Sequence, residues 1–240
     1  MQSNFVKIYG DKRVGTNYMK FVLEKNFHVV ALMNILGWKH GKHPEKIDWS
    51  GDSWIDPRFK KNRKNFVKLR AQILKCVPEG LKRACRRGNL RYIVCVRHPI
   101  HSFVSHMKVL GYKEDYITKY IKRWNNVYSD WSNLVDSHKR AIFVRHEDMV
   151  GNFEHTMEII RKALQLQVSG DAYVNTQTKL ARKSDENWHQ RKGPLSGKKY
   201  DARQTKKQYA KVVSPRVLRL MRAGLRQDLL TRFDYAIKTA

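Results

Sequence analysis

The chain has 240 residues, of which 49 are Lys or Arg and 21 are Asp or Glu, so its formal net charge is +28. A chain of this length can bury one substantial core, and we expect a single domain over residues 1–240. Hydrophobic residues make up 41% of the chain, which excludes the composition of an intrinsically disordered protein. The excess of positive charge predicts a polyanionic ligand, partner or surface that offsets self-repulsion.

The N-terminus and the cysteines indicate the cellular environment. A strand-like run begins within the first few residues, so the chain shows neither a signal peptide nor a segment long enough to span a bilayer. The three cysteines, Cys76, Cys85 and Cys95, have no CxxC spacing, so neither a disulfide framework nor a zinc knuckle is indicated. We therefore expect a cytoplasmic protein with reduced thiols and no membrane span.

Strand and helix patterns alternate from the N-terminus onward. Residues 4–10, NFVKIYG, read as a first strand, and apolar residues at helical spacing predict a helix over 18–27. A second apolar run, rich in β-branched residues at its start, covers 28–36. Residues 37–57 are rich in Gly, Pro, Asp and Trp, which predicts a long loop, and long loops in compact domains are often functional.

The middle of the chain continues the alternation. A basic stretch at 62–76 has helical spacing, and RYIVCV at 91–96 is the clearest buried strand in the chain. A helix is predicted to begin at Pro99. A further helix carries three aromatic residues that we expect in the core rather than in a binding site. These residues are Trp124, Tyr128 and Trp131.

A last strand and helix complete the pattern. AIFVR at 141–145 reads as a strand, and Asn152 is a predicted N-cap for an amphipathic helix. The apolar face of that helix consists of Phe153, Met157, Ile160 and Leu164. Alternating strands and helices predict an α/β fold with a mainly parallel sheet, whose ligand lies beyond the carboxyl ends of the strands.

The turn between the first strand and the first helix has the spacing of a phosphate-binding loop, from Gly10 to Gly15. Backbone N–H groups at a helix N-terminus carry partial positive charge, and glycine lets an anion approach them closely. A nucleotide-hydrolysing P-loop continues with a lysine for the phosphates and a hydroxyl for magnesium, but Thr16 and Asn17 stand there. The loop therefore suits a single phosphate that carries a sulfuryl group. Its basic residues are Lys12 and Arg13.

Two later segments carry groups that suit a second phosphate. Arg97 ends its strand and Ser105 follows about two helical turns later, so both side chains can meet on one anion. The guanidinium supplies two directed donors and the hydroxyl a third. QRKGPLSGKK at 190–199 is a basic glycine loop that can fold over a ligand. Its first basic residues are Arg191 and Lys192.

In these segments the chain resembles the PAPS-dependent sulfotransferase family, which moves a sulfuryl group from 3′-phosphoadenosine 5′-phosphosulfate to an acceptor hydroxyl or amine. KRVGTNY is similar to the family's 5′-phosphosulfate loop, and RHPIHSFVS to its 3′-phosphate motif. RKGPLSGK is similar to the C-terminal R-K-G-x-x-G loop with one residue extra, and FVRHEDMVGNFEHTMEIIRKAL to the strand and helix around R-Y-E-D-L. The resemblance implies the P-loop-like three-layer sulfotransferase architecture.

The resemblance also implies a donor site for PAPS, with PAP as the product and no metal expected. The 5′ side would be held by Lys12, Arg13, Val14, Gly15, Thr16 and Asn17. The 3′ side would be held by Arg97, Ser105, Arg191, Lys192 and Gly193. Catalytic stabilisation of the leaving phosphate would fall to Arg13 and Lys12.

The chain departs from the family's motifs at several positions. Arg13 stands where many members have a lysine, and an arginine can stabilise charge but is a poor proton donor, so Lys12 is a second candidate. Val14 replaces the usual serine and removes one hydroxyl contact. His98 and His101 stand where Asn or Asp is common.

The base that removes the acceptor's proton is expected among the ten histidines, since histidine is the commonest general base. The long loop after the second strand contains His40 and His43, in a stretch where branches of the resembled family place this base. We predict His40 first and His43 second. His106, beside Ser105, is the remaining candidate.

Three other functions stay open at this point. A basic nucleic-acid-binding protein would explain the charge, although no recognisable nucleic-acid-binding motif accompanies it. A P-loop kinase would need magnesium. A metal site from His98, His101 and His106 has suggestive spacing without a nearby cysteine. For the transferase, the positive charge favours an anionic acceptor, either a small molecule or a glycan.

Overall fold

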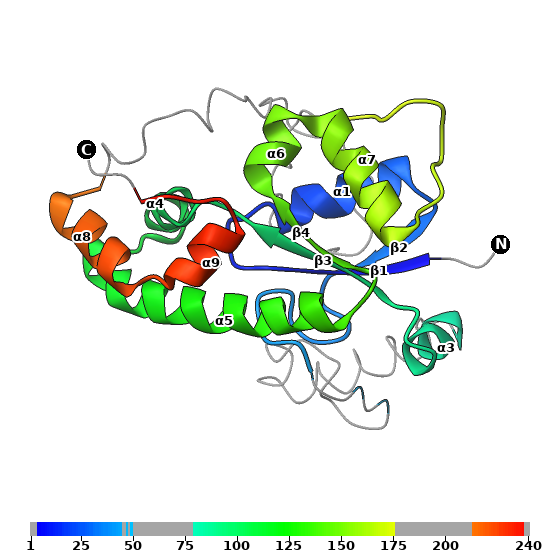
Figure 1. Cartoon of the computed structure of the whole chain (residues 1–240), viewed down its shortest axis with the longest axis horizontal. Coiled ribbons are helices and arrows are strands. Elements are labelled where there is room, and N and C mark those ends of the chain that lie inside the picture. The colour runs from blue at the N-terminus through cyan, green and yellow to red at the C-terminus, as the bar shows by residue number, and fades with distance from the viewer. Residues whose placement is uncertain (1–3, 45–46, 48, 50–78, 176–212, 238–240) are drawn as a thin grey trace.

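A computed structural model describes residues 4–44, 47, 49, 79–175 and 213–237 (Figure 1). The four strands of this part are β1 (Asn4–Gly10), β2 (Val29–Leu32), β3 (Arg91–Val96) and β4 (Ala141–Arg145). The longer helices are α1 (Thr16–Asn26), α4 (Pro99–Leu110), α5 (Ile117–Ser137), α7 (Phe153–Leu164) and α8 (Pro215–Gly224). The shorter ones are α3 (Glu79–Arg86), η2 (Glu114–Tyr116), α6 (His146–Gly151) and α9 (Gln227–Arg232).

The described strands form one parallel sheet in the order β2-β1-β3-β4. The register pairs Gly10 with Cys95 and Val96 with Arg145, so the carboxyl ends of β1, β3 and β4 lie at one edge. From β1 the chain crosses to β2 on one side, and it later enters β3 on the other side of β1. The strand order therefore reverses between β1 and β3, which is where ligands bind in open α/β sheets.

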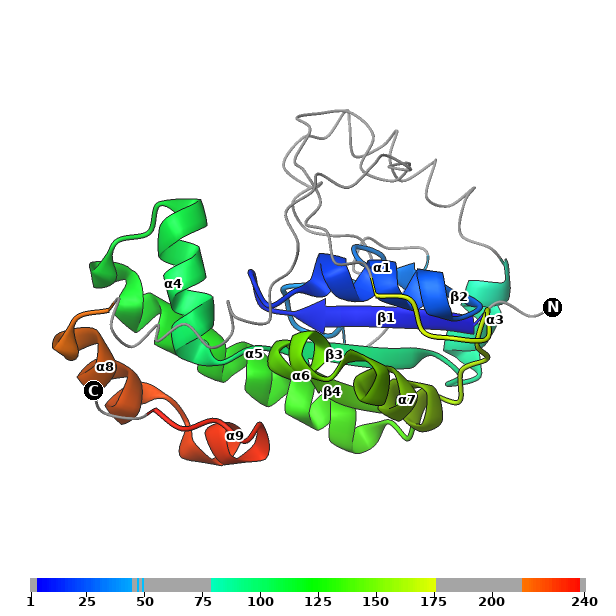
Figure 2. The ribbon, with the colours of Figure 1, turned by 90° about the horizontal axis from the view of Figure 1, so that it is seen from above.

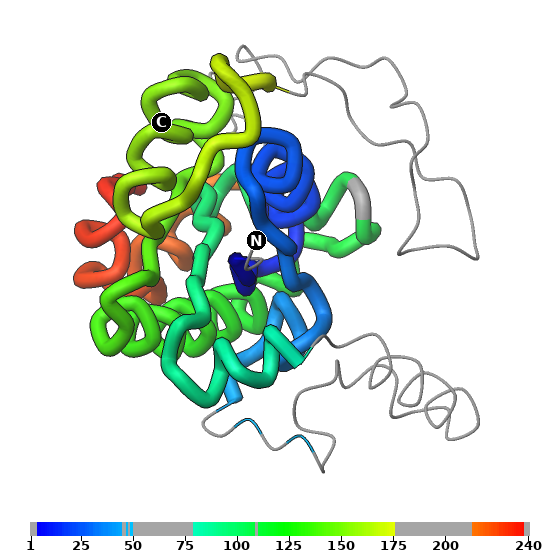
Figure 3. Tube along the Cα trace, turned by 90° about the vertical axis from the view of Figure 1, so that its right-hand side faces the viewer, coloured from blue at the N-terminus to red at the C-terminus, as the bar shows by residue number. Residues whose placement is uncertain are grey.

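Helices cover both faces of the sheet and make three layers (Figures 1 and 3). Val6 and Ile8 of β1 point into a core shared with α1 and α7, whereas Phe5 and Tyr9 point into a core shared with α5, α8 and α9. Helix α4 lies beyond the carboxyl ends of the strands (Figure 2). The predicted α/β fold with a parallel sheet and three layers is confirmed.

Most predicted elements are present at the expected places. The three aromatic residues of α5 are buried, and so is the apolar face of α7. Asn152 is at the N-cap of α7, but its backbone oxygen rather than its side chain makes the bond, accepting from Thr156. The basic stretch at 62–76 lies outside the described residues. Among the described helices, none combines the length and hydropathy that a membrane crossing requires.

The second strand is shorter than the apolar run that predicted it. It ends at Leu32, because the next residues turn their carbonyl oxygens toward a buried lysine of β1. The Nζ of Lys7, with a fully buried side chain, donates to the oxygens of Met33, Ile35 and Gly37 at 2.8–2.9 Å. This lysine directs the loop after β2 along the α5 face of the sheet and back to the end of β1.

Candidate functional site

The loop between β1 and α1 turns sharply beneath the first turn of the helix. Arg13 has φ +69° and Gly15 has φ +93°, and the left-handed conformation is strained for a residue other than glycine. Gly15 is the N-cap of α1, and a Cβ at this position would lie 2.7 Å from Nδ1 of the buried His146. Only glycine can therefore occupy this N-cap position without strain. The free N–H groups at the start of α1 follow directly after it, as in an anion-binding helix N-terminus.

Helix α4 and the residue Arg97, which lies between β3 and α4, contact this loop directly. Arg97 Nη1 donates to the backbone oxygen of Arg13 at 3.0 Å, and Arg13 Nε donates to Ser105 Oγ at 3.1 Å. Ring nitrogen Nε2 of His106 lies 2.9 Å from the backbone oxygen of Lys12. Arg97 Nε is buried and has no hydrogen-bond partner among the described residues. The structure therefore brings together the two segments that the sequence assigned to the two phosphate groups of one ligand, and it leaves the buried Nε of Arg97 without an acceptor there.

The loop after β2 returns to the same place. The backbone N–H of Gly10 donates to the oxygen of Lys39 at 2.9 Å, and His40 Nδ1 lies 2.5 Å from the oxygen of Gly10. Lys39 is 3% exposed, and its Nζ donates to Asn17 Oδ1 in the first turn of α1 at 2.6 Å. Sequence reasoning missed this lysine, because nothing in the sequence distinguishes it from the other basic residues of the loop.

The two histidines predicted as the base are separated. His43 lies on the α5 face of the sheet, where its Nδ1 is 3.0 Å from the hydroxyl of Tyr9 and its backbone N–H donates to Asp130. Its ring also faces Tyr92 and His138. Burial, with the nearby His138 and Lys7, lowers the pKa of His43 to about 4. Of the two candidates, only His40 contacts the β1–α1 loop.

The two basic residues of the loop point to different neighbours. Arg13 reaches Ser105 on α4, as described above. The Nζ of Lys12 lies 6.0 Å from the centre of the Trp38 ring, and that ring is 5.4 Å from the ring of His40. Lys12 is thus on the side of the predicted base, whereas Arg13 is on the side of the predicted 3′-phosphate residues.

A partly buried carboxylate supports the start of α4. Glu147 Oε1 accepts from the backbone N–H of His98 at 3.0 Å and lies 3.4 Å from His101 Nδ1, while Oε2 accepts from the Tyr235 hydroxyl at 2.8 Å. Burial alone would raise the pKa of Glu147, but these hydrogen bonds outweigh burial and lower it to about 2. The carboxylate fixes the backbone directly after Arg97.

The remaining predicted residues do not extend the site within the described chain. Arg191, Lys192 and Gly193 lie outside the described residues. The histidines weighed as metal ligands are divided, because His98 and His101 face Glu147 while His106 faces the β1–α1 loop. In the described part of the chain, no group of three or more His, Cys, Asp or Glu side chains could hold a metal ion.

Comparison with known proteins finds sulfotransferases. The sequence profile of the Sulfotransferase family matches residues 81–170, which include Arg97, Ser105 and Glu147. The sulfotransferase domain of the Synechococcus PCC 7002 olefin synthase has the same fold, with a TM-score of 0.51 and 15% sequence identity over 98% of this chain and 94% of that domain. The resemblance to the sulfotransferase family is confirmed.

Two further comparisons were made with a solved structure and with curated sequences. Mouse sulfotransferase SULT7A1 complexed with PAP aligns with a TM-score of 0.45 and 15% identity, covering 95% of this chain and 84% of that one. No curated protein sequence matches the chain.

Proposed function

We propose that this protein transfers the sulfuryl group of PAPS to a hydroxyl or amine of an acceptor and releases PAP. The observation that carries the proposal is the contact of Arg97 and Ser105 with the β1–α1 loop. An anion-binding helix N-terminus and a second cationic group lie side by side at the point where the strand order of the sheet reverses. A donor with anionic groups at the 5′ and the 3′ positions of an adenosine matches this arrangement.

The two sides of the proposed donor site follow from the contacts. On the 5′ side, the N–H groups of residues 14–17 and the ammonium groups of Lys12 and Lys39 would bind the phosphosulfate. On the 3′ side, Arg97 with Ser105 would bind the phosphate, and the buried Arg97 Nε would gain an acceptor. Arg13, which the sequence assigned to the 5′ side, reaches Ser105 and is therefore proposed as a 3′ contact instead. By sequence motif, Arg191, Lys192 and Gly193 are proposed as further 3′ contacts.

The chemistry uses His40 as the base and a cation beside it. With Gly10 oxygen as its acceptor, His40 Nδ1 carries the proton, and Nε2 is then the basic nitrogen. The acceptor oxygen attacks sulfur as its proton passes to Nε2, and the bond between sulfur and the bridging oxygen breaks. That oxygen takes the electron pair and leaves as part of PAP, where Lys12 stabilises its charge. The cationic surface suits an anionic acceptor.

Calorimetry tests the donor site, with PAP added in the presence of EDTA and ATP added in the presence of magnesium. We expect wild-type protein to bind PAP and Arg97→Ala to bind it about 10- to 100-fold more weakly, because a charge-assisted contact to phosphate is lost. Arg219→Ala is the matched control, since Arg219 is exposed on α8. Transfer of labelled sulfate from PAPS to a panel of hydroxyl and amine acceptors then tests the reaction.

Three results would contradict the proposal. Wild-type protein could bind magnesium ATP and ignore PAP, which would favour a kinase. It could bind DNA or RNA tightly without competition from PAP, which would favour a nucleic-acid-binding protein. PAP affinity unchanged in Arg97→Ala would remove the role of Arg97 in the donor site.

A further inference from the structure

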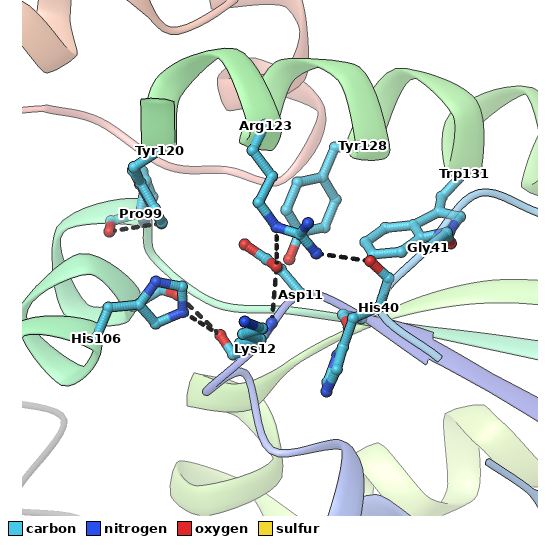
Figure 4. Close-up of polar contacts among 12 residues, drawn as sticks. Asp11, Lys12, His40, Gly41, Pro99, His106, Tyr120, Arg123, Tyr128 and Trp131 are labelled. Atoms are coloured by element: carbon cyan, nitrogen blue, oxygen red, sulfur yellow. Dashed lines mark hydrogen bonds and ion pairs between the residues drawn. The ribbon is translucent and has the colours of Figure 1, made fainter. Parts of the chain in front are cut away.

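One arginine of α5 joins the two loops of the proposed site (Figure 4). Arg123 Nε donates to Asp11 Oδ1 in the β1–α1 loop at 2.9 Å, and its Nη2 donates to the backbone oxygen of His40 at 2.6 Å. Its guanidinium carbon also lies 5.6 Å from the centre of the Trp38 ring. A single planar guanidinium thus contacts the loop of the proposed donor site and the residue proposed as the base.

The Asp11 carboxylate needs a cation at this place. Its side chain is 1% exposed, and Oδ1 accepts both from Arg123 and from the backbone N–H of Lys12 at 2.8 Å. A buried negative charge at the base of a loop that binds an anion would repel that anion, unless a cation balances it. Arg123 balances it, and the Lys12 N–H holds the carboxylate against the turn.

Helix α5 holds this arginine in place through its buried packing against the sheet. Tyr128 and Trp131, on the same helix, have fully buried side chains and pack under the sheet. Trp131 Nε1 donates to the oxygen of Gly41, one residue after His40, at 3.1 Å. The helix therefore holds the loop after β2 at two adjacent residues, and Arg123 extends this support to the β1–α1 loop.

We propose that Arg123 is a positioning residue that sets the donor loop and His40 relative to each other. Its Nε acts on the donor loop through Asp11, and its Nη2 acts on the backbone of His40. The role of Arg123 in catalysis rests on the proposed sulfuryl transfer, whereas its hydrogen bonds to the two loops do not depend on that function.

Variants of Arg123 test its contact with Asp11 and its contact with the backbone of His40. Arg123→Lys keeps a cation for Asp11 but lacks the planar pair of donors, so we expect PAP affinity within about 3-fold of wild type and kcat lower by about 10-fold. Arg123→Met removes both contacts and leaves the charge of Asp11 without a balancing cation. In this variant PAP affinity should fall by about 10-fold or more, in addition to the fall in kcat. In Arg123→Met combined with Asp11→Asn, PAP affinity should recover while kcat stays low. The matched control is Lys122→Met, at an exposed neighbouring position on α5.

Amide hydrogen exchange of the free protein supplies a readout without nucleotide. In Arg123→Met we expect faster exchange in segments 10–17 and 37–43 and unchanged exchange in β3. If that variant does not fold, the double variant with Asp11→Asn is measured instead, and segment 37–43 should still exchange faster. Unchanged exchange in 37–43, or equal losses of PAP affinity and kcat in Arg123→Lys, would overturn the role of Arg123. A wild-type protein that binds no PAP would instead overturn the proposed function.

Discussion

Replacing Glu147 with glutamine tests the support under the start of α4. The amide has the shape of the protonated carboxyl, so the substitution removes the charge and keeps the volume. Hydrogen bonds from the His98 backbone, His101 and Tyr235 lower the pKa of Glu147 from 4.5 to about 2, although burial opposes them. At 1.36 kcal/mol for each pKa unit, this pKa difference corresponds to about 3 kcal/mol of folding stability at pH 7.

The pH dependence gives the prediction its sign. Because the pKa is lower in the folded state than in the unfolded chain, the stabilisation by Glu147 is complete above the unfolded value of 4.5. It is lost as the pH falls toward about 2, and about 1.4 kcal/mol remains at pH 3. The stability difference between wild type and Glu147→Gln should therefore shrink by about half between pH 7 and pH 3.

Urea unfolding of both proteins at several pH values measures this difference directly. Glu154→Gln is the matched control, because Glu154 is exposed on the neighbouring helix α7 and loses the same charge. We also expect weaker PAP binding by Glu147→Gln, since the backbone after Arg97 loses a charged acceptor. A stability difference below about 1 kcal/mol at pH 7, or one that is equal at pH 3 and pH 7, would refute the reasoning.

Two further substitutions and one alkylation reaction test particular features of the structure. In Gly15→Ala the new Cβ would meet His146 Nδ1 at 2.7 Å at φ +93°, so we expect a lower Tm and at least about 10-fold weaker PAP binding by calorimetry; wild-type affinity would contradict this. Lys7→Met would leave the carbonyl groups of 33–37 without their shared donor, lowering the unfolding free energy by about 3 kcal/mol in urea; a change below about 1 kcal/mol would count against the anchor. Burial raises the pKa of Cys85 to about 11, so peptide mass spectrometry should show its alkylation at pH 8 to be about 100-fold slower than that of an ordinary thiol, and equal rates would disprove it.

The strands and the helices α1, α4, α5 and α7 could be predicted because their signals are local. Alternating or continuous apolar residues, Pro99 at a helix start and Gly15 at a left-handed position act through near neighbours in the chain. The end of β2 could not be predicted, because it depends on Lys7, which lies 26 to 30 residues away from the carbonyl groups it binds.

Site residues were predictable to the extent that they lie in short motifs. The segments around Lys12 and Arg97 were found by spacing and by resemblance, and the structure brings them into contact. Lys39 was missed because a single buried lysine in a loop has no sequence signature. Arg123 was missed because its partner Asp11 is 112 residues away and no helical pattern distinguishes it from the other basic residues of α5.

The sequence by itself determined the kinds of element, the order of the anion-binding motifs and the excess of positive charge, since each depends on residue type and close spacing. Only the tertiary structure decided that His40 and not His43 contacts the β1–α1 loop, and that Lys12 and Arg13 point to opposite sides of it. The reason is physical: these outcomes depend on hydrogen bonds between segments far apart in the chain, and packing of α5 and the sheet brings those segments together.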